Sequence, residues 1–353
     1  MLLTEGPARA DIRGCEYAFG YFVPWKNAMV PALRELGNDV ICFGAEHPAA
    51  LLLQSARVAR ELERWKADLV HCHLPLASLV GRVAGKLARI PVISTEHNLL
   101  ERYHPATRRA TLLAWRLQAQ VIAVSDEVAA SIRRHAPSSV AVEVVPNGVS
   151  LQHFDPSRFD SAKCRRELGI PPDAPVVGTV AVLRPQKRFD LWLEAAQIIA
   201  RARPECWFVI VGDGPLRAEI EGRIRDAGLE GRVLLPGLRD EVRPFLAAMD
   251  VYMMSSDFEG LPVALLEAMA MSRIPVVTGV GGIPQVVSDQ NGRVVPPREP
   301  AALAAAVLDV LALPDRAELG RNARSTVQAR FSIERMLKQT EALYATVLGR
   351  GRA

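Results

Sequence analysis

Short segments rich in β-branched residues alternate with longer segments of helical periodicity almost throughout this chain. Strands are predicted near residues 39–43, 68–72, 91–94, 121–124, 140–145, 176–182, 207–211, 233–235, 251–254, 275–277 and 293–295. Strands that alternate with helices form parallel sheets whose faces are covered by those helices. The sequence therefore predicts an α/β fold with two similar sheets.

The chain has 353 residues, which favours two domains over one. A turn-forming triplet at 146–148 follows a predicted strand, and a polar stretch through Asp160 precedes the second alternating unit. We predict two doubly wound, Rossmann-like domains at 1–148 and 149–330 that face an interdomain cleft. An amphipathic helix is expected over 331–348, within the terminal segment 331–353.

Composition excludes several classes of protein. No apolar run reaches the ~18 residues of a membrane helix, and the first residues lack a charged segment followed by an apolar core. We therefore expect a cytoplasmic protein, with attachment to the inner face of the membrane left open. The formal net charge of +4 comes without a long cationic run, so nucleic acid is not an expected partner.

Two carboxylates with seven residues between them mark the most informative stretch. Glu259 lies in a glycine-proline turn after a predicted strand, and Glu267 lies within the helix that Pro262 begins. A helix start offers unpaired N–H groups to an anion, while carboxylates accept hydrogen bonds from hydroxyls. The combination suits a sugar attached to a phosphate.

Two cations precede another predicted helix. Arg184 and Lys187 stand in the loop after the predicted strand 176–182. Arginine can grip two phosphate oxygens at once, and lysine adds a compact charge. Positive charge near a helix start is mildly unfavourable for stability. A role in binding a diphosphate therefore explains this pair of cations better than a structural role does.

These motifs occur together with a Gly281-Gly282 turn and a Val-Pro-Asn-Gly linker at 145–148. The set resembles the GT-B-fold retaining glycosyltransferases of family four, also called glycosyl transferases group 1. The resemblance covers nearly all of the chain and is strongest over 123–297. It implies a nucleotide diphosphate sugar as donor, no cofactor, a glycan, lipid or small-molecule acceptor, and a role in cell-envelope polysaccharide or glycolipid synthesis. It also implies that the terminal helix packs on the first domain.

The resemblance assigns roles to individual residues. Glu259 would hold hydroxyls of the transferred hexose, Glu267 would bind the ribose, and His97 would contact the sugar near the reaction centre, with Arg184 and Lys187 on the diphosphate. The remaining donor-binding residues are Gly260, Leu261 and Val263 through their N–H groups, Gly212 and Gly214 near the base or ribose, Leu238 near the base, and Gly14 near the diphosphate. Ordinary turns at 212–215 and a strand-capping histidine at 97 remain alternatives.

A metal site is not expected. His71 and His73 alternate along a predicted strand and so face one side of it, but other ligands are lacking. No Asp-x-Asp motif lies near the proposed pocket. We therefore predict a transferase that needs no divalent cation.

The sequence departs from the resembling family in two places, near its start and at position 285. Only residues 1–4 stand for a full first strand, Cys15 occupies a loop that is usually glycine-rich, and Gln285 stands where glutamate is frequent.

A nucleotide-sugar epimerase of the same fold would need acid and base carboxylates in the first domain, and Asp68, Glu96 and Glu101 suggest no such arrangement. A non-catalytic subunit of a transferase is a third hypothesis. The stretch 103–120, with its interleaved arginines, could touch lipid headgroups or form an ordinary surface helix.

Overall fold

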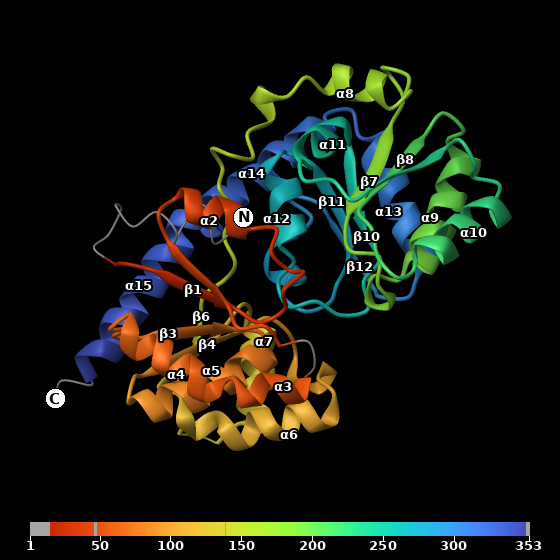
Figure 1. Ribbon diagram of the computed structural model, residues 1–353. Helices are drawn as coiled ribbons and strands as arrows, with labels where there is room; N and C mark the ends of the chain where they lie inside the picture. The colour runs from red at the N-terminus through yellow and green to blue at the C-terminus, as the bar shows by residue number, and fades with distance from the viewer. Residues whose placement is uncertain (1–14, 46–47, 138, 351–353) are drawn as a thin grey trace. The chain divides into compact units, whose positions relative to one another are not determined.

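The computed structural model describes residues 15–45, 48–137 and 139–350. These residues form two compact units (Figure 1). Unit 1 comprises the described residues of Met1–Gly148 and Ile333–Ala353, and unit 2 comprises Val149–Ser332. All pairings between the strands of either unit are parallel, which confirms the predicted α/β fold.

The sheet of unit 2 has six strands in the order β12-β11-β10-β7-β8-β9. Their bounds are β7 (Val176–Val180), β8 (Trp207–Val211), β9 (Val233–Gly237), β10 (Val251–Met254), β11 (Ile274–Thr278) and β12 (Arg293–Val295). Strands β10 and β11 are buried along their whole length, as a parallel sheet covered on both faces requires. The chain adds strands outward in both directions from β7 and β10, the two central strands.

Helices cover both faces of this sheet. They are α8 (Ser161–Glu167), α9 (Phe189–Ala202), α10 (Arg217–Asp226), α11 (Arg243–Ala248), α12 (Val263–Ala270), α13 (Pro300–Ala312) and α14 (Arg316–Arg330), with short 3-10 turns η4 (Pro156–Arg158), η5 (Pro185–Lys187) and η6 (Ile283–Gln285). Helices α9, α10 and α13 bury their apolar faces against one side of the sheet, and α11, α12 and α14 lie on the other (Figure 1).

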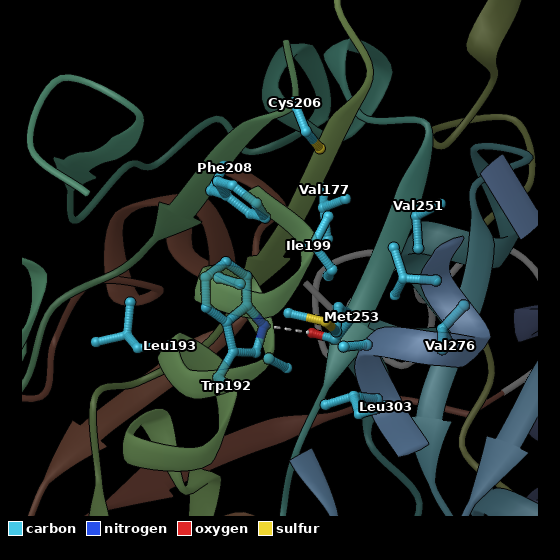
Figure 2. Close-up of a cluster of buried hydrophobic side chains, with 14 of the residues drawn as sticks. Val177, Trp192, Leu193, Ile199, Cys206, Phe208, Val251, Met253, Val276 and Leu303 are labelled. Atoms are coloured by element: carbon cyan, nitrogen blue, oxygen red, sulfur yellow. Dashed lines mark hydrogen bonds between the residues drawn. The ribbon is translucent and has the colours of Figure 1, made fainter. Parts of the chain in front are cut away.

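A tryptophan fastens α9 to the centre of the sheet. The indole N–H of Trp192 donates to the carbonyl oxygen of Met253 in β10 at 3.0 Å, and its ring meets Phe208 edge to face (Figure 2). All three residues are fully buried. The start of α9, and the loop that leads into it from β7, are thereby fixed beside β10.

Unit 1 has a four-stranded sheet in the order β3-β4-β5-β6 and a separate pair β1-β2. The strands are β1 (Ala18–Tyr21), β2 (Asp39–Cys42), β3 (Val70–His73), β4 (Val92–Glu96), β5 (Gln120–Ala123) and β6 (Val142–Val144). The helices are α2 (Val30–Glu35), α3 (Pro48–Leu53), α4 (Ser55–Arg64), α5 (Pro75–Ala88), α6 (Pro105–Ala114) and α7 (Asp126–His135), with the 3-10 turns η2 (Leu100–Arg102) and η3 (Trp115–Leu117).

Strand β1 was not among the predicted strands. Its residues are alternately exposed and half-buried, and Gly20 in its interior has no side chain to pack. The segment therefore lacks the apolar run by which the other strands were recognised. Residues 1–4, which stand in place of the first strand of the resembling family, and the loop residue Gly14 lie outside the described residues.

Helix α15 (Ile333–Arg350) belongs to unit 1 although it is last in the sequence. Val347 shares a hydrophobic cluster with Ile93, Ile122 and Val145 of the β4-β5-β6 region. The ring of Tyr344, on the same helix, meets the edge of a histidine ring in β3. In the part of the chain that the structure describes, no helix is long and apolar enough to cross a lipid bilayer.

Candidate functional site

In the sheet of unit 2, the order in which the strands are added reverses between β7 and β10. This place is the topological switch point of the sheet. The chain continues from β7 toward β9 on one side and from β10 toward β12 on the other, so the loops after these two strands diverge. In open parallel sheets, ligands bind in the crevice that this divergence leaves at the carboxyl ends of the strands. The Arg184–Lys187 loop follows β7 and the Glu259 loop follows β10, so both predicted motifs lie at the switch point.

Lys187 and Glu259 form an ion pair across these two loops. The ammonium Nζ lies 2.6 Å from the Oε1 atom, and the side chains are 19% and 8% exposed. The backbones also meet, because the N–H of Asp257 donates to the carbonyl oxygen of Gln186 at 2.9 Å. A basic and an acidic group are thus held together in a partly dry setting, where their interaction is stronger than in water.

Arg184 begins the 3-10 turn that ends at Lys187. Its side chain is exposed and makes no hydrogen bond or ion pair with another residue that the structure describes. One cation of the predicted pair is therefore neutralised by a carboxylate, and the other is open to solvent.

Glu267 lies on α12 and is half-buried. Burial raises the pKa of its carboxyl group to about 7. The charges of Glu267 and Glu259 both add to the rise in the pKa of buried Tyr252, whose main cause is desolvation. Both carboxylates therefore lie near the same point of β10, with Val263 in the first turn of α12 between them in sequence.

The Gly281-Gly282 turn rests on the loop that carries Glu259. Gly281 has a φ of +59°, and a Cβ atom there would overlap the carbonyl oxygen of Glu259. The N–H of Gly282 donates to the carbonyl oxygen of Gly260 at 2.6 Å. Glycine is required here because two backbones come into direct contact, and Gly260 and its neighbour Leu261 are buried beneath the turn.

Two further loops border the other side of the switch point. A Cβ atom at Gly212, which has a φ of +135°, would overlap the carbonyl oxygen of Ala181, and one at Gly214 would lie 2.6 Å from the carbonyl oxygen of Leu183. The N–H of Gly212 donates to the carbonyl oxygen of Gly237 at 2.9 Å. The structure therefore brings the loops after β8 and β9 up against the loop after β7, and Leu238 leaves β9 with its side chain 76% exposed.

His97 lies in unit 1, in the loop that follows β4. Its Nε2 atom is 3.0 Å from Nδ1 of His73. Burial lowers the pKa of His97 to about 4, so the imidazole is neutral at pH 7. A neutral ring suits a hydrogen bond to a hydroxyl, and in the His73–His97 pair one ring donates and the other accepts.

His71 has both ring nitrogens occupied. Its Nδ1 atom lies 2.6 Å from the hydroxyl of Tyr344, and its Nε2 atom lies 2.7 Å from the hydroxyl of Thr95. A ring engaged on both sides cannot also ligate a metal ion without losing one of these bonds. No group of three or more His, Cys, Asp or Glu in the described ranges is arranged to hold one.

The carboxylates of unit 1 have structural partners. Glu96, 1% exposed, is ion-paired with the fully buried Arg82 and accepts a hydrogen bond from the hydroxyl of Tyr103 at 2.5 Å. Glu101 contacts a serine, an arginine and a histidine of α7, and these hydrogen bonds hold its pKa at about 2 despite the opposing effect of desolvation. An acid and base pair for epimerisation does not arise from groups engaged in this way.

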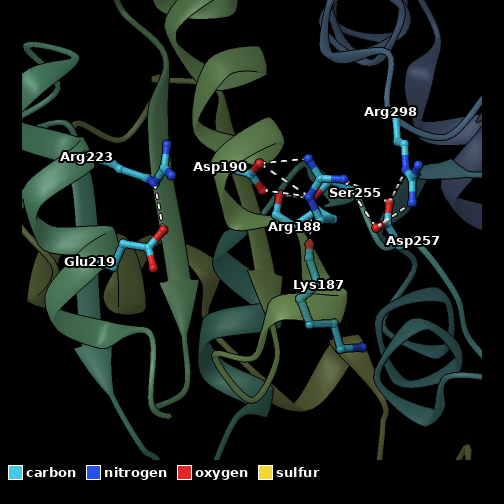
Figure 3. A network of polar contacts seen from close by, with 8 residues as sticks. All are labelled: Lys187, Arg188, Asp190, Glu219, Arg223, Ser255, Asp257 and Arg298. Atoms are coloured by element: carbon cyan, nitrogen blue, oxygen red, sulfur yellow. Dashed lines mark hydrogen bonds and ion pairs between the residues drawn. The ribbon is translucent and has the colours of Figure 1, made fainter. Parts of the chain in front are cut away.

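An ion network beside Lys187 was not anticipated from the sequence. Arg188 and Arg298 both bind the carboxylate of Asp257, and the Ser255 hydroxyl donates to the carbonyl oxygens of Lys187 and Arg188 (Figure 3). The only signal in the sequence is position, because Arg188 adjoins Lys187 and Asp257 stands two residues before Glu259.

A family model for glycosyl transferases group 1 matches residues 160–326, and one for glycosyltransferase family 4 matches residues 24–153. A D-inositol 3-phosphate glycosyltransferase of Saccharomonospora viridis is 31% identical over 76% of this chain and 67% of that protein. The chain is a group 1 glycosyltransferase.

Other relatives of this glycosyltransferase agree with the family assignment. A 2-deoxystreptamine glucosyltransferase of Streptomyces kanamyceticus is 29% identical over 92% of this chain and 88% of that protein. Among solved structures, Anabaena HepE in complex with UDP and glucose superposes with a TM-score of 0.85 at 24% identity, over 98% of this chain and 95% of that one. The predicted GT-B fold class is thereby confirmed.

Proposed function

We propose that this glycosyltransferase moves a hexose from a nucleotide diphosphate sugar to an acceptor with retention of anomeric configuration. The observation that carries the proposal is the Lys187–Glu259 pair at the switch point, with the exposed Arg184 three residues away. Cations would face the diphosphate and the carboxylate would face the sugar, which are the two ends of one donor.

Donor binding would exchange the partners of this ion pair. The diphosphate replaces Glu259 as the partner of Lys187, and sugar hydroxyls replace Lys187 as donors to Glu259. Arg184 adds a planar group that can bind two phosphate oxygens. As the anomeric bond breaks, negative charge grows on the departing diphosphate, and cations already in place stabilise it without reorganisation.

The rest of the donor pocket is proposed from the loops around the switch point. Glu267 would accept hydrogen bonds from the ribose, and the N–H groups of Gly260, Leu261 and Val263 would face the donor. The loops at 212–214 and 238 would border the base. HepE was solved with UDP and glucose, which supports a uridine nucleotide and glucose as the first donor to try.

Retention requires the acceptor hydroxyl to approach from the face that the diphosphate leaves. In the proposed reaction the acceptor oxygen bonds to the anomeric carbon, the bond from that carbon to the β-phosphate oxygen breaks, and the acceptor proton passes to the phosphate oxygen. No enzymic nucleophile is needed. His97, neutral at pH 7, would orient a sugar hydroxyl rather than carry the proton.

Contact with an anionic membrane surface is part of the proposal. Helix α6 and η3 expose Leu113, at 84%, beside Arg109 and Arg116. The sequence from 102 to 117 contains arginines and no acidic residue. Such a face attracts acidic headgroups and can insert an apolar side chain among them. The proposed place of action is accordingly the cytoplasmic side of a membrane.

A donor-hydrolysis assay tests the proposed function. The intact protein is incubated with uridine, guanosine and adenosine diphosphate hexoses that have an α-linkage, and the released sugar is followed by NMR from the first minutes. We expect one donor to release the α-anomer first, before mutarotation. Initial release of the β-anomer would refute retention, and an epimerised donor would favour the epimerase alternative. Binding of a donor without turnover, even with added acceptors, would favour a non-catalytic subunit.

A further inference from the structure

Arg188 is held in a conformation that side chains rarely adopt. Its φ of 50° and ψ of 53° place it in the left-handed region, where a Cβ atom approaches the backbone. It stands directly after Lys187 and begins α9. Residues in such conformations persist when surrounding contacts enforce them, and they concentrate at functional sites.

The contacts that enforce it reach two other segments. The Arg188 guanidinium donates to Asp190 in the first turn of α9 at 2.8 Å and to Asp257 at 3.1 Å (Figure 3). Asp257 lies in the loop after β10, two residues before Glu259. The carboxyl pKa values of both aspartates are lowered, mainly by hydrogen bonds from arginine side chains.

A second arginine holds the same carboxylate from outside. Arg298, in the loop after β12, also has a positive φ, of 66°, and its Nε atom lies 3.0 Å from Oδ1 of Asp257. Its side chain is 66% exposed, whereas those of Arg188 and Asp257 are 25% and 16% exposed. The inner contact, between Arg188 and Asp257, is therefore the better shielded from solvent.

We propose that Arg188 and Asp257 are positioning residues that hold the two loops carrying Lys187 and Glu259 in the alignment that lets both side chains reach one nucleotide diphosphate sugar. The inference rests on the proposed function of the site. The ion pair joins the two loops that carry the binding groups, and the Ser255 hydroxyl and the N–H of Asp257 join the same loops through the backbone.

This arrangement is poorly explained as a device for stability alone. Helix α9 is already fastened to β10 by the buried Trp192 and its bond to Met253. Ion pairs with partial exposure contribute little to folding. In the left-handed region, arginine is also less favourable for folding than glycine. Selection for stability alone would therefore favour glycine over Arg188.

The decisive variant is Arg188→Gly, because glycine accepts the backbone conformation while the guanidinium is lost. We expect its melting temperature to equal or exceed that of the wild type. We expect its KM for the donor and its Kd for the nucleoside diphosphate to rise about tenfold, the scale of effect when binding groups lose their alignment. Asp257→Asn should act in the same direction, and Arg188→Lys should recover part of the affinity.

Arg298→Ala is the matched control, since it removes the exposed arginine from the same carboxylate. Its Kd should stay within about twofold of the wild type, because exposed ion pairs are weak. Wild-type affinity in both Arg188→Gly and Asp257→Asn would overturn the inference and leave the proposed function intact. A lower kcat at unchanged KM and Kd would also overturn it, since donor binding would then not depend on the Arg188–Asp257 pair. If the wild type binds no nucleotide, the proposed function itself fails.

Discussion

The ammonium of Lys187 lies 2.6 Å from the Glu259 carboxylate, although 72 positions separate the two residues in sequence. Neither charge is fully hydrated, so each is stabilised by the other. Both groups are also the proposed ligands of opposite ends of the donor. In this structure, the two proposed donor-binding groups, Lys187 and Glu259, are therefore each other's ion-pair partners.

Removing one member of this pair should harm folding more than removing both. Lys187→Ala leaves a buried carboxylate without a partner, and we expect a loss of about 2 kcal/mol in the free energy of unfolding. Adding Glu259→Gln to that variant removes the unpaired charge and should restore part of the loss. Urea unfolding of the wild type, both single variants and the double variant measures the coupling, and strictly additive changes would contradict it.

The pKa of Glu267 should appear in the pH dependence of nucleotide binding. Burial raises the pKa of this group to about 7 in the folded protein, so it gains its negative charge as pH rises through that value. A carboxylate accepts hydrogen bonds from ribose hydroxyls better than the protonated form does. The ratio of wild-type to Glu267→Gln affinity should therefore increase from pH 6 to pH 8. Comparison with this variant removes the titration of the nucleotide itself.

Ionisation of Glu267 should strengthen nucleotide binding but lower the stability of the folded protein. A carboxyl whose folded pKa lies above its unfolded value favours the folded state at low pH, and this contribution is lost as pH rises from the unfolded pKa through about 7. In the absence of nucleotide, the Glu267→Gln variant should therefore gain stability relative to the wild type between pH 5 and pH 8. A constant difference across that range would show that Glu267 titrates normally.

Gly281→Ala tests the contact between the turn and the Glu259 loop. The added methyl group would overlap a backbone oxygen, and the positive φ adds strain. We expect a loss of at least about 2 kcal/mol in the free energy of unfolding. Gly169 offers a matched control, because its φ of +72° is similar but no atom lies near its Cβ position. Equal losses in the two alanine variants would show that backbone strain alone is responsible.

Chelation should leave activity unchanged. In the proposed mechanism Arg184 and Lys187 neutralise the departing diphosphate, so a divalent cation has no task to perform. Initial donor hydrolysis should be equal in EDTA and in added Mg²⁺ or Mn²⁺. A rate that falls in EDTA and recovers with one of these ions would contradict the assignment of the two cations.

His71 should make the protein less stable in mild acid. Burial lowers the folded pKa of this group to about 3, so between pH 6.5 and pH 5 only the unfolded chain takes up its proton. Over that interval the wild type should lose up to about 2 kcal/mol more than His71→Gln does. Parallel pH dependence of the two melting curves would contradict the depressed pKa.

Periodicity was sufficient to predict the sheet of unit 2 and the helix that carries Glu267. Strands β10 and β11 there are buried along their whole length, because both faces of the sheet are covered. The same reasoning missed β1, where Gly20 and half-exposed neighbours leave no such run. Local pattern thus predicts the elements that are buried along their whole length.

Contacts between distant side chains were beyond the sequence. Position alone indicated that Lys187 and Glu259 follow strands, but their direct pairing depends on which strands become neighbours. The Arg188–Asp257 pair and the His73–His97 hydrogen bond likewise join residues from different loops. Such pairings are products of tertiary structure, and single-sequence patterns contain no information on them.

Calorimetric titration with a nucleoside diphosphate and its parent nucleoside tests the central claim most directly. The wild type should bind one diphosphate from the uridine, guanosine and adenosine set much more tightly than the matching nucleoside. Arg184→Ala and Lys187→Ala should each weaken diphosphate binding about tenfold, the scale of a lost charged hydrogen bond, and leave nucleoside binding unchanged. Equal affinity for diphosphate and nucleoside, or wild-type diphosphate affinity in both variants, would contradict the account.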